Sequence, residues 1–150
     1  MLEWFPMRTR DVAVLILHCK GKILLQKRPK DAERFPDSWG LFGGGLKKGE
    51  TPEQALKREA VEELGLKIRS PKLTGSYPYV LPERNEKGNT FVFIERYDGS
   101  PLILREGQMM KWCLPSRALR TKAHPIYRKI IKKLCTAGLL LPGPKSYDCP

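Results

Sequence analysis

Residues 43–66 constrain the fold of this chain more than any other segment, because they specify a glycine turn followed by a helix with defined ends. The triplet Gly43-Gly44-Gly45 lets the backbone approach a ligand closely. Thr51 is a favourable N-cap, and Pro52 suits the first helical position. Gln54 occupies the position of the second residue of a capping box. Gly65 can adopt the left-handed conformation that ends helices. The sequence therefore predicts a helix from about residue 52 to residue 64.

The remaining hydrophobic periodicity alternates between strand and helix. Buried strands read as short runs of Val, Ile, Leu and aromatic residues, and helices as apolar residues three or four positions apart. We expect strands at Asp11–Cys19, Lys22–Gln26, Trp39–Phe42, Leu66–Val80, Thr90–Tyr97 and Gly107–Leu114, loops at Lys27–Ser38 and Pro82–Gly88, a helical turn at Pro115–Leu119 and a second long helix at Pro125–Cys135. This order predicts an α/β domain over residues 11–138, with an extension at 1–10 and a tail at 139–150.

Composition and charge narrow the classes of protein. No apolar run is long enough to span a bilayer, and no secretory pattern opens the chain, so a cytoplasmic location is expected. The four cysteines form no Cys-x-x-Cys pair, which argues against a zinc site. The net charge is +12, and residues 101–150 hold ten Lys or Arg against Glu106 and Asp148. Such a surface attracts polyanions such as nucleotides or RNA, although a solvated basic helix face would give the same composition.

Three glutamates stand together on the predicted helix. Glu59, Glu62 and Glu63 have the spacing i, i+3, i+4, so they project from one side of the helix. Like charges this close repel each other, so a cation is expected between them. Carboxylate oxygens prefer hard cations, magnesium first and manganese as a substitute. An exposed acidic helix face is the alternative. Arg58 can pair with an acid outside the helix, such as Glu50.

The spacing of these residues resembles a known family. Gly44, Glu50 and the run Arg58-Glu59-Ala60-Val61-Glu62-Glu63-Leu64-Gly65-Leu66 match the 23-residue box of the Nudix hydrolases, with Ala60 small for its bulky aliphatic position. A weaker similarity to the MutT branch extends over roughly residues 11–134. The resemblance implies a Nudix-type α/β/α sandwich with a mixed sheet and a magnesium-dependent pyrophosphohydrolase.

The resemblance also implies roles for individual residues. Glu59, Glu62 and Glu63 would hold the metal with help from the Gly43 carbonyl, and Arg58 would pair with Glu50 to join the loop to the helix. Glu59 would be the general base, and Arg58 and Glu62 would complete the catalytic set. An acid beyond the box often serves as ligand or base, which nominates Glu106; a plain loop charge is the alternative.

The substrate implied is a nucleoside diphosphate linked to a further group, most simply a nucleoside triphosphate or its oxidised form, cleaved to a monophosphate and pyrophosphate. Candidate substrate contacts are Arg28, Phe35 and His124, each with a structural alternative as a loop charge, a loop anchor or a helix-end residue. His124 stands where MutT enzymes carry a base-reading amide. An imidazole cannot offer a donor and an acceptor to one base edge, so the base remains open.

Two other functions are compatible with the same residues. The basic C-terminal third favours hydrolysis at a triphosphorylated RNA 5′ end as a first alternative. A non-catalytic nucleotide sensor is the second, but a binder would not need three intact glutamates. The sequence predicts no membrane partner and leaves the oligomeric state open.

Overall fold

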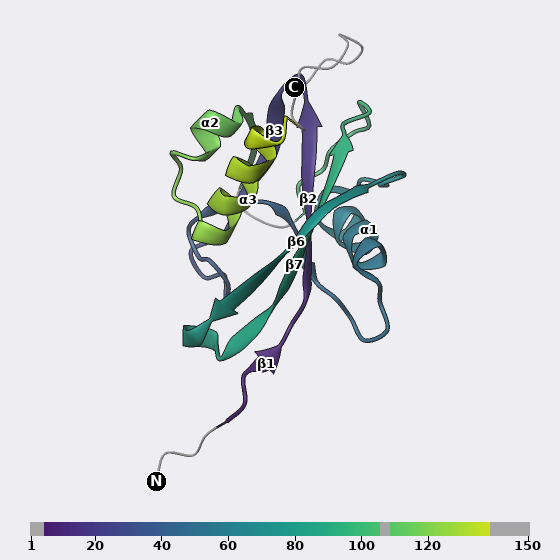
Figure 1. Ribbon diagram of the computed structural model, residues 1–150. Helices are drawn as coiled ribbons and strands as arrows, with labels where there is room; N and C mark the ends of the chain where they lie inside the picture. Colours follow the sequence, from purple (N-terminus) through teal and green to yellow (C-terminus); the bar gives the residue numbers. More distant parts are fainter. Residues whose placement is uncertain (1–4, 106–108, 139–150) are drawn as a thin grey trace.

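A computed structural model describes residues 5–105 and 109–138 of the chain. A mixed sheet lies between two layers of helix (Figure 1). Helix α1 (Pro52–Leu64) covers one face of the sheet, and α2 (Pro115–Ala118) and α3 (Pro125–Thr136) cover the other. The predicted α/β/α sandwich with a mixed sheet is confirmed.

The described residues form one sheet of eight strands. They are β1 (Arg8–Thr9), β2 (Val12–Cys19), β3 (Lys22–Lys27), β4 (Trp39–Gly40), β5 (Phe42–Gly45), β6 (Lys72–Leu81), β7 (Glu86–Arg96) and β8 (Met109–Cys113). The main order is β1-β7-β2-β3-β4, while β5 pairs with β2, β6 with β7 and β8 with β3. The pairs β1–β7 and β2–β7 are parallel and the others are antiparallel.

Strand β2 divides its side chains between two hydrophobic cores. Val12, Val14 and Ile16 pack with residues of α2 and α3. Ala13 and Leu15, which alternate with them, pack with residues of α1. A strand covered on both faces must be apolar at every position, which explains the uninterrupted apolar run in the sequence. The same strand pairs with β5, and so holds the glycine triplet against the sheet.

Three elements differ from the sequence expectations. The single strand expected at Trp39–Phe42 is two, because β4 pairs with β3 while β5 pairs with β2 and runs on to Gly45. The strand expected from Leu66 begins only at Lys72 and has a register shift before Gly75. The loop expected at Pro82–Gly88 is shorter, since the 3-10 turn η1 (Pro82–Arg84) leads within two residues into β7. Each difference depends on which strand becomes the partner, which local propensity does not encode.

Both long helices lie where the pattern placed them, and α1 begins and ends at the predicted residues. Its stripe of Leu56, Ala60 and Leu64 is buried as expected. The helical turn after β8 is also present as α2. Among the described residues, no helix has the length and apolar character needed to cross a membrane.

Candidate active site

Local signals set the ends of α1. The Thr51 side chain accepts a hydrogen bond from the Gln54 backbone at 3.2 Å, and the Gln54 side chain accepts one from the Thr51 backbone at 2.9 Å. This capping box satisfies two of the N–H groups that a helix start leaves without partners. At the other end Gly65 adopts φ 64°. These caps fix the residues at which α1 begins and ends. Within the helix, the spacing of the three glutamates then determines the side from which they project.

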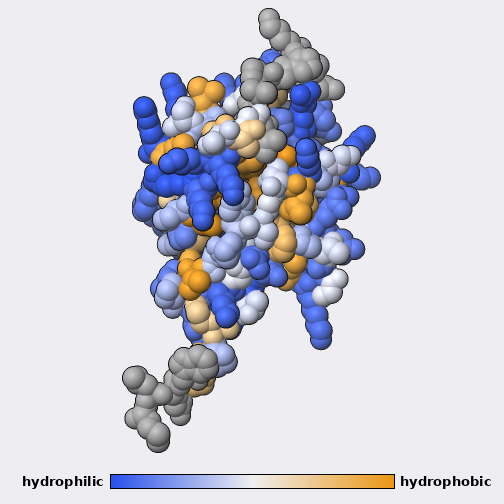
Figure 2. Space-filling view, in the orientation of Figure 1, coloured by the Kyte–Doolittle hydropathy of each residue, from blue (hydrophilic) through white to orange (hydrophobic). Residues whose placement is uncertain are grey.

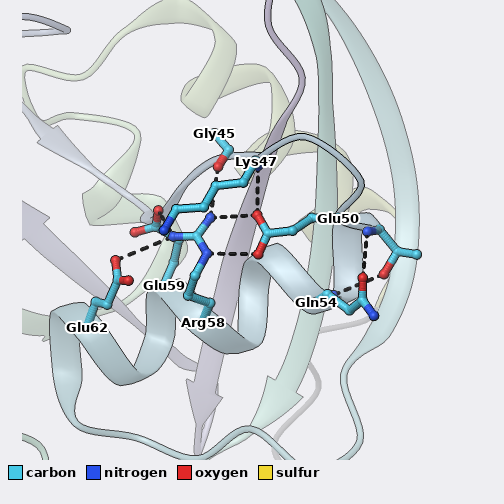
Figure 3. A network of polar contacts seen from close by, with 8 residues as sticks. Gly45, Lys47, Glu50, Gln54, Arg58, Glu59 and Glu62 are labelled. Carbon is cyan, nitrogen blue, oxygen red and sulfur yellow. Dashed lines mark hydrogen bonds and ion pairs between the residues drawn. The ribbon is translucent and has the colours of Figure 1, made fainter.

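Arg58 is the centre of a polar network between the loop and the helix (Figure 3). Its Nε and Nη2 each donate to one oxygen of Glu50 at 2.8 Å, and Nη2 also donates to the Gly45 carbonyl at 3.0 Å. The paired hydrogen bonds lower the pKa of Glu50 to about 2 and raise the pKa of Arg58. The two side chains are 18% and 21% exposed, so this predicted pair is only partly buried.

The same guanidinium draws two of the box glutamates together. Arg58 Nη1 lies 2.8 Å from Glu59 Oε1 and 3.4 Å from Glu62 Oε2 (Figure 3). Glu59 is mostly covered, at 15% exposed, whereas Glu62 is 46% exposed. The two carboxylates therefore converge on one point, and a positive charge occupies it. Because Arg58 is also held by Glu50 and Gly45, it stays anchored if Nη1 gives way to another cation.

Glu63 has a different environment from the other two glutamates. It is 3% exposed, and its Oε1 accepts a hydrogen bond from the Gly43 backbone at 3.0 Å. Its Oε2 accepts one from Gln26 Nε2 at 3.1 Å. These contacts tie α1 to β5 and β3, so Glu63 joins the helix to the sheet beneath the cleft.

The glycine triplet allows this close packing. Gly43 has φ 143°, and a Cβ there would lie 2.0 Å from the Ala13 carbonyl oxygen. A Cβ at Gly44 would lie 2.4 Å from Glu59 Oε1. No other residue fits at either position without displacing the backbone of β2 or the carboxylate of Glu59.

A cleft opens beside the glutamates and has two adjoining parts. The larger, about 290 Å³, is lined by two acids, Glu59 and Glu63, and by two arginines, Arg10 and Arg28. The smaller, about 80 Å³, shares both arginines and the glycines. Its other walls are Val12, Val14, Arg34, Phe35 and Tyr127. Carboxylates and guanidinium groups thus line one cleft, next to a recess with both arginine and aromatic walls.

Of the three predicted substrate contacts, two line this cleft and one does not. Arg28 lines both parts, and its Nε donates to the Arg34 carbonyl at 2.6 Å. Phe35 forms a wall of the recess, and one of its faces stacks on His124 with ring centroids 4.1 Å apart. His124 is not among the residues lining the recess. Its Nδ1 accepts from the Ile126 backbone and caps α3, and burial lowers the pKa of its imidazole.

Other site residues fall outside the sequence expectations. Glu106 lies outside the described residues. Arg10, Arg34 and Gln26 were not predicted, although all three line the cleft. Gln26 carried a signal, because it is a polar residue that ends an apolar strand run. The two arginines carried none, since one stands in the extension and the other in a loop without periodicity.

The donor set fits a hard divalent cation. Glu59 and Glu63 bring carboxylate oxygens to the cleft, and Glu62 shares with Glu59 the point held by Arg58. Oxygen donors of this kind suit magnesium and manganese. As they stand, no three His, Cys, Asp or Glu side chains of the described chain converge into a metal cluster. One Glu63 oxygen accepts a hydrogen bond from Gly43 and the other from Gln26, and each carboxylate oxygen has a second lone pair with which it could bind a cation in the cleft.

Comparison with known proteins gives a family. The sequence model of the NUDIX domain family matches residues 7–134 of this chain. A nucleoside triphosphatase (NudI) of Enterobacter sp. strain 638 is 45% identical over 62 residues, covering 41% of this chain and 44% of that protein. An RNA pyrophosphohydrolase of Mannheimia succiniciproducens is 34% identical over 108 residues, covering 69% of this chain and 47% of that protein. The chain therefore spans less than half the length of these two relatives.

Solved structures share the fold over nearly the whole chain. The MutT protein of Methanosarcina mazei Go1 superposes with a TM-score of 0.78 at 21% identity, covering 90% of this chain and 99% of that one. The ORF135 protein of E. coli gives 0.76 at 24% identity, covering 92% and 96%. At such identities the likeness shows the fold alone. Together with the family model, which covers most of the sequence, it means that this chain belongs to the Nudix family.

Proposed function

We propose that this chain is a magnesium-dependent pyrophosphohydrolase that cleaves nucleoside triphosphates, including oxidised forms, to a nucleoside monophosphate and pyrophosphate. The observation that carries the proposal is the pairing of Glu59 and Glu63 with Arg10 and Arg28 in one cleft. The acids suit a divalent cation, and the arginines suit phosphate oxygens, to which a guanidinium can donate two hydrogen bonds at once. The nucleoside triphosphatase among the relatives is consistent with this substrate.

The residues have separate tasks in the proposed reaction. Arg10 and Arg28 hold phosphate oxygens and offset their charge. Glu59, beside Gly44, accepts the proton of the attacking water, with Glu106 as the alternative base. Magnesium, when bound by the box glutamates and the Gly43 carbonyl, neutralises phosphate charge and lowers the pKa of water. Phe35 lines the recess, and its proposed role is to contact a base or ribose there.

The decisive experiment replaces Glu62, whose side chain is 46% exposed. The wild type is incubated with Mg²⁺ and a panel of canonical and oxidised nucleoside triphosphates, and released pyrophosphate is measured. Glu62→Gln removes a charged metal donor without opening the core, so turnover should be abolished while the thermal melt stays nearly unchanged. The matched control is Glu53→Gln on the same helix, whose exposed carboxylate pairs only with Lys57 at 3.8 Å among the ion pairs of the described residues.

Two results would contradict the proposal. One is an absence of turnover by the wild type on every nucleotide tested. The other is hydrolysis that survives Glu62→Gln. Loss of activity in the Glu53→Gln control would show that the assay responds to helix charge rather than to the metal site.

A second candidate substrate is a triphosphorylated RNA 5′ end. Residues 109–138 contain no Asp or Glu, and the basic side chains of α2, α3 and their connection are largely exposed; the exposed ones are Arg117, Arg120, Lys122, Lys129, Lys132 and Lys133. Figure 2 shows strongly hydrophilic side chains over this side of the molecule. A basic face beside a phosphate-binding cleft favours an extended polyanion. The RNA pyrophosphohydrolase among the relatives is consistent with this candidate.

A further inference from the structure

Glu86 is a buried acid outside the box that the proposed reaction does not use. It is the first residue of β7 and is 1% exposed. Its Oε1 lies 2.9 Å from the Tyr79 hydroxyl and 3.3 Å from Arg34 Nη1. Burying a carboxylate is costly unless it is paired and hydrogen-bonded. The burial of Glu86 therefore depends on the polar and charged groups around it.

Three arginines share this one carboxylate. Arg34, at 3.3 Å, is the nearest, while Arg84 Nε and Arg8 Nη2 lie 3.9 and 3.8 Å from Glu86 Oε2. Arg84 also donates from Nη1 to the Glu33 carbonyl at 2.9 Å. Its buried Nε has no hydrogen-bond partner. Arg84 Nη2 also lies 3.6 Å from Glu33 Oε2, so the cluster combines three arginines with two carboxylates and keeps one positive charge in excess.

Of these arginines, Arg34 reaches the cleft. It lines the recess next to the glycines, and its side chain is only 14% exposed. Its guanidinium carbon lies 5.4 Å from the Phe35 ring centroid and 5.3 Å from that of Tyr79. Arg8 is 69% exposed, and neither it nor Arg84 lines the recess. Arg34 thus lies close to two aromatic rings, with Glu86 as its counter-charge, and lines the recess.

We infer that Glu86 is a positioning residue, which holds Arg34 so that its guanidinium donates to acceptor oxygens of the substrate. The inference rests on the proposed function, because it assigns how that same cleft grips a nucleotide. A guanidinium that is already ordered loses less conformational entropy when substrate arrives. Phosphate oxygens and the adjacent O6 and N7 of guanine present the same acceptor chemistry to an arginine.

The test is a double-mutant cycle on nucleotide hydrolysis. Glu86→Gln keeps the shape and the contact with Tyr79 but releases Arg34, so KM should rise about 10-fold with kcat little changed. Glu86→Asp keeps the charge and should recover part of the loss. In an Arg34→Met background Glu86→Gln should have no further effect, because the group it positions is gone.

Arg8→Met supplies the matched control. Arg8 also pairs with Glu86 but is exposed and does not line the recess. In that background Glu86→Gln should retain its full effect on KM. An equal effect of Glu86→Gln with and without Arg34, or a change that only follows the thermal melt, would overturn the inference.

Comparing the four nucleoside triphosphates identifies the substrate atoms that Arg34 contacts. A KM increase equal for GTP, ATP, CTP and UTP assigns the contact to phosphate, and one confined to GTP assigns it to the guanine edge. The same double-mutant cycle is then repeated on the equilibrium binding of GTP, which is measured by calorimetry. The Glu62→Gln background is used for this so that GTP is not hydrolysed. If hydrolysis by the wild type fails while that binding cycle holds, the proposed function is wrong and the role of Glu86 stands. If the wild type hydrolyses nucleotides and the cycle shows no coupling, the role of Glu86 is wrong.

Discussion

At the scale of single residues, the bidentate pair between Glu50 and Arg58 links stability to pH. The pKa of Glu50 is about 2 in the folded chain, below its ordinary value of 4.5. A lowered pKa means that the folded state prefers the charged form. The pair therefore stabilises the fold fully above pH 4.5 and loses this contribution as the pH falls toward 2.

Glu50→Gln tests this linkage. The difference in melting temperature between wild type and variant should be largest above pH 4.5 and should narrow between pH 4.5 and 2. Circular-dichroism melts at intervals across pH 2–7 measure it. A difference that stays constant across this range would show that the charge on Glu50 does not contribute.

The sequence predicted contacts between candidate site residues where a short-range spacing defines them. The pair Glu50–Arg58 and the convergence of Glu59 with Glu62 follow from box spacing and helix geometry. The burial of Glu63 does not, because it depends on Gly43 and Gln26, which reach the helix only in the folded sheet.

At the scale of elements, β5 owes its form to a glycine. A Cβ at Gly43 would meet both the Ala13 carbonyl and the Val14 Cα, and φ there is 143°. Gly49 also has a positive φ, of 82°, but a Cβ there would meet nothing within 4 Å. An alanine at each of the two positions therefore separates the free-energy cost of backbone strain from the cost of a steric clash.

Gly43→Ala should therefore destabilise the protein by about 3–5 kcal/mol, from strain together with overpacking. Gly49→Ala should cost about 1–2 kcal/mol, from backbone conformation alone. Urea unfolding of both variants gives the comparison. Equal losses would mean that β5 can move away from β2 at little cost.

The elements also show which parts of a fold are readable from sequence. The ends of α1 come from Thr51, Pro52 and Gly65, which act within one turn, and they were predicted to the residue. The division of Trp39–Gly45 into β4 and β5 was not predicted, because it requires a change of partner strand at Leu41. Propensity describes a strand, but only the assembled sheet decides which neighbour it joins.

At the scale of the whole molecule, residues 109–138, which include α2 and α3 (Figure 1), carry basic side chains and no Asp or Glu. If RNA is the substrate, its chain beyond the 5′ end should lie against this surface. Lys129 and Lys132 are exposed on α3. Replacing both with Glu should weaken RNA hydrolysis and leave hydrolysis of free GTP nearly unchanged, since neither lysine lines the cleft.

The control replaces Lys67 and Arg69, two exposed residues after α1, with Glu, which changes the net charge equally. Rates on triphosphorylated RNA and on GTP are measured from low to high salt. Wild-type activity on RNA should fall more steeply than activity on GTP, and the α3 variant should flatten that slope. Equal slopes for both substrates, or equal effects of the two double variants, would leave free nucleotides as the substrate.

The placement of β2 has a consequence for how the protein loses activity. Its alternate side chains belong to opposite cores, and its backbone pairs with the glycine strand β5. Neither helical layer can detach without exposing one face of this strand to water. Unfolding should then be a single cooperative event, in which amide protection of β2, order in the glycine turn and catalytic competence disappear together. Partly melted forms that still turn over substrate should not accumulate.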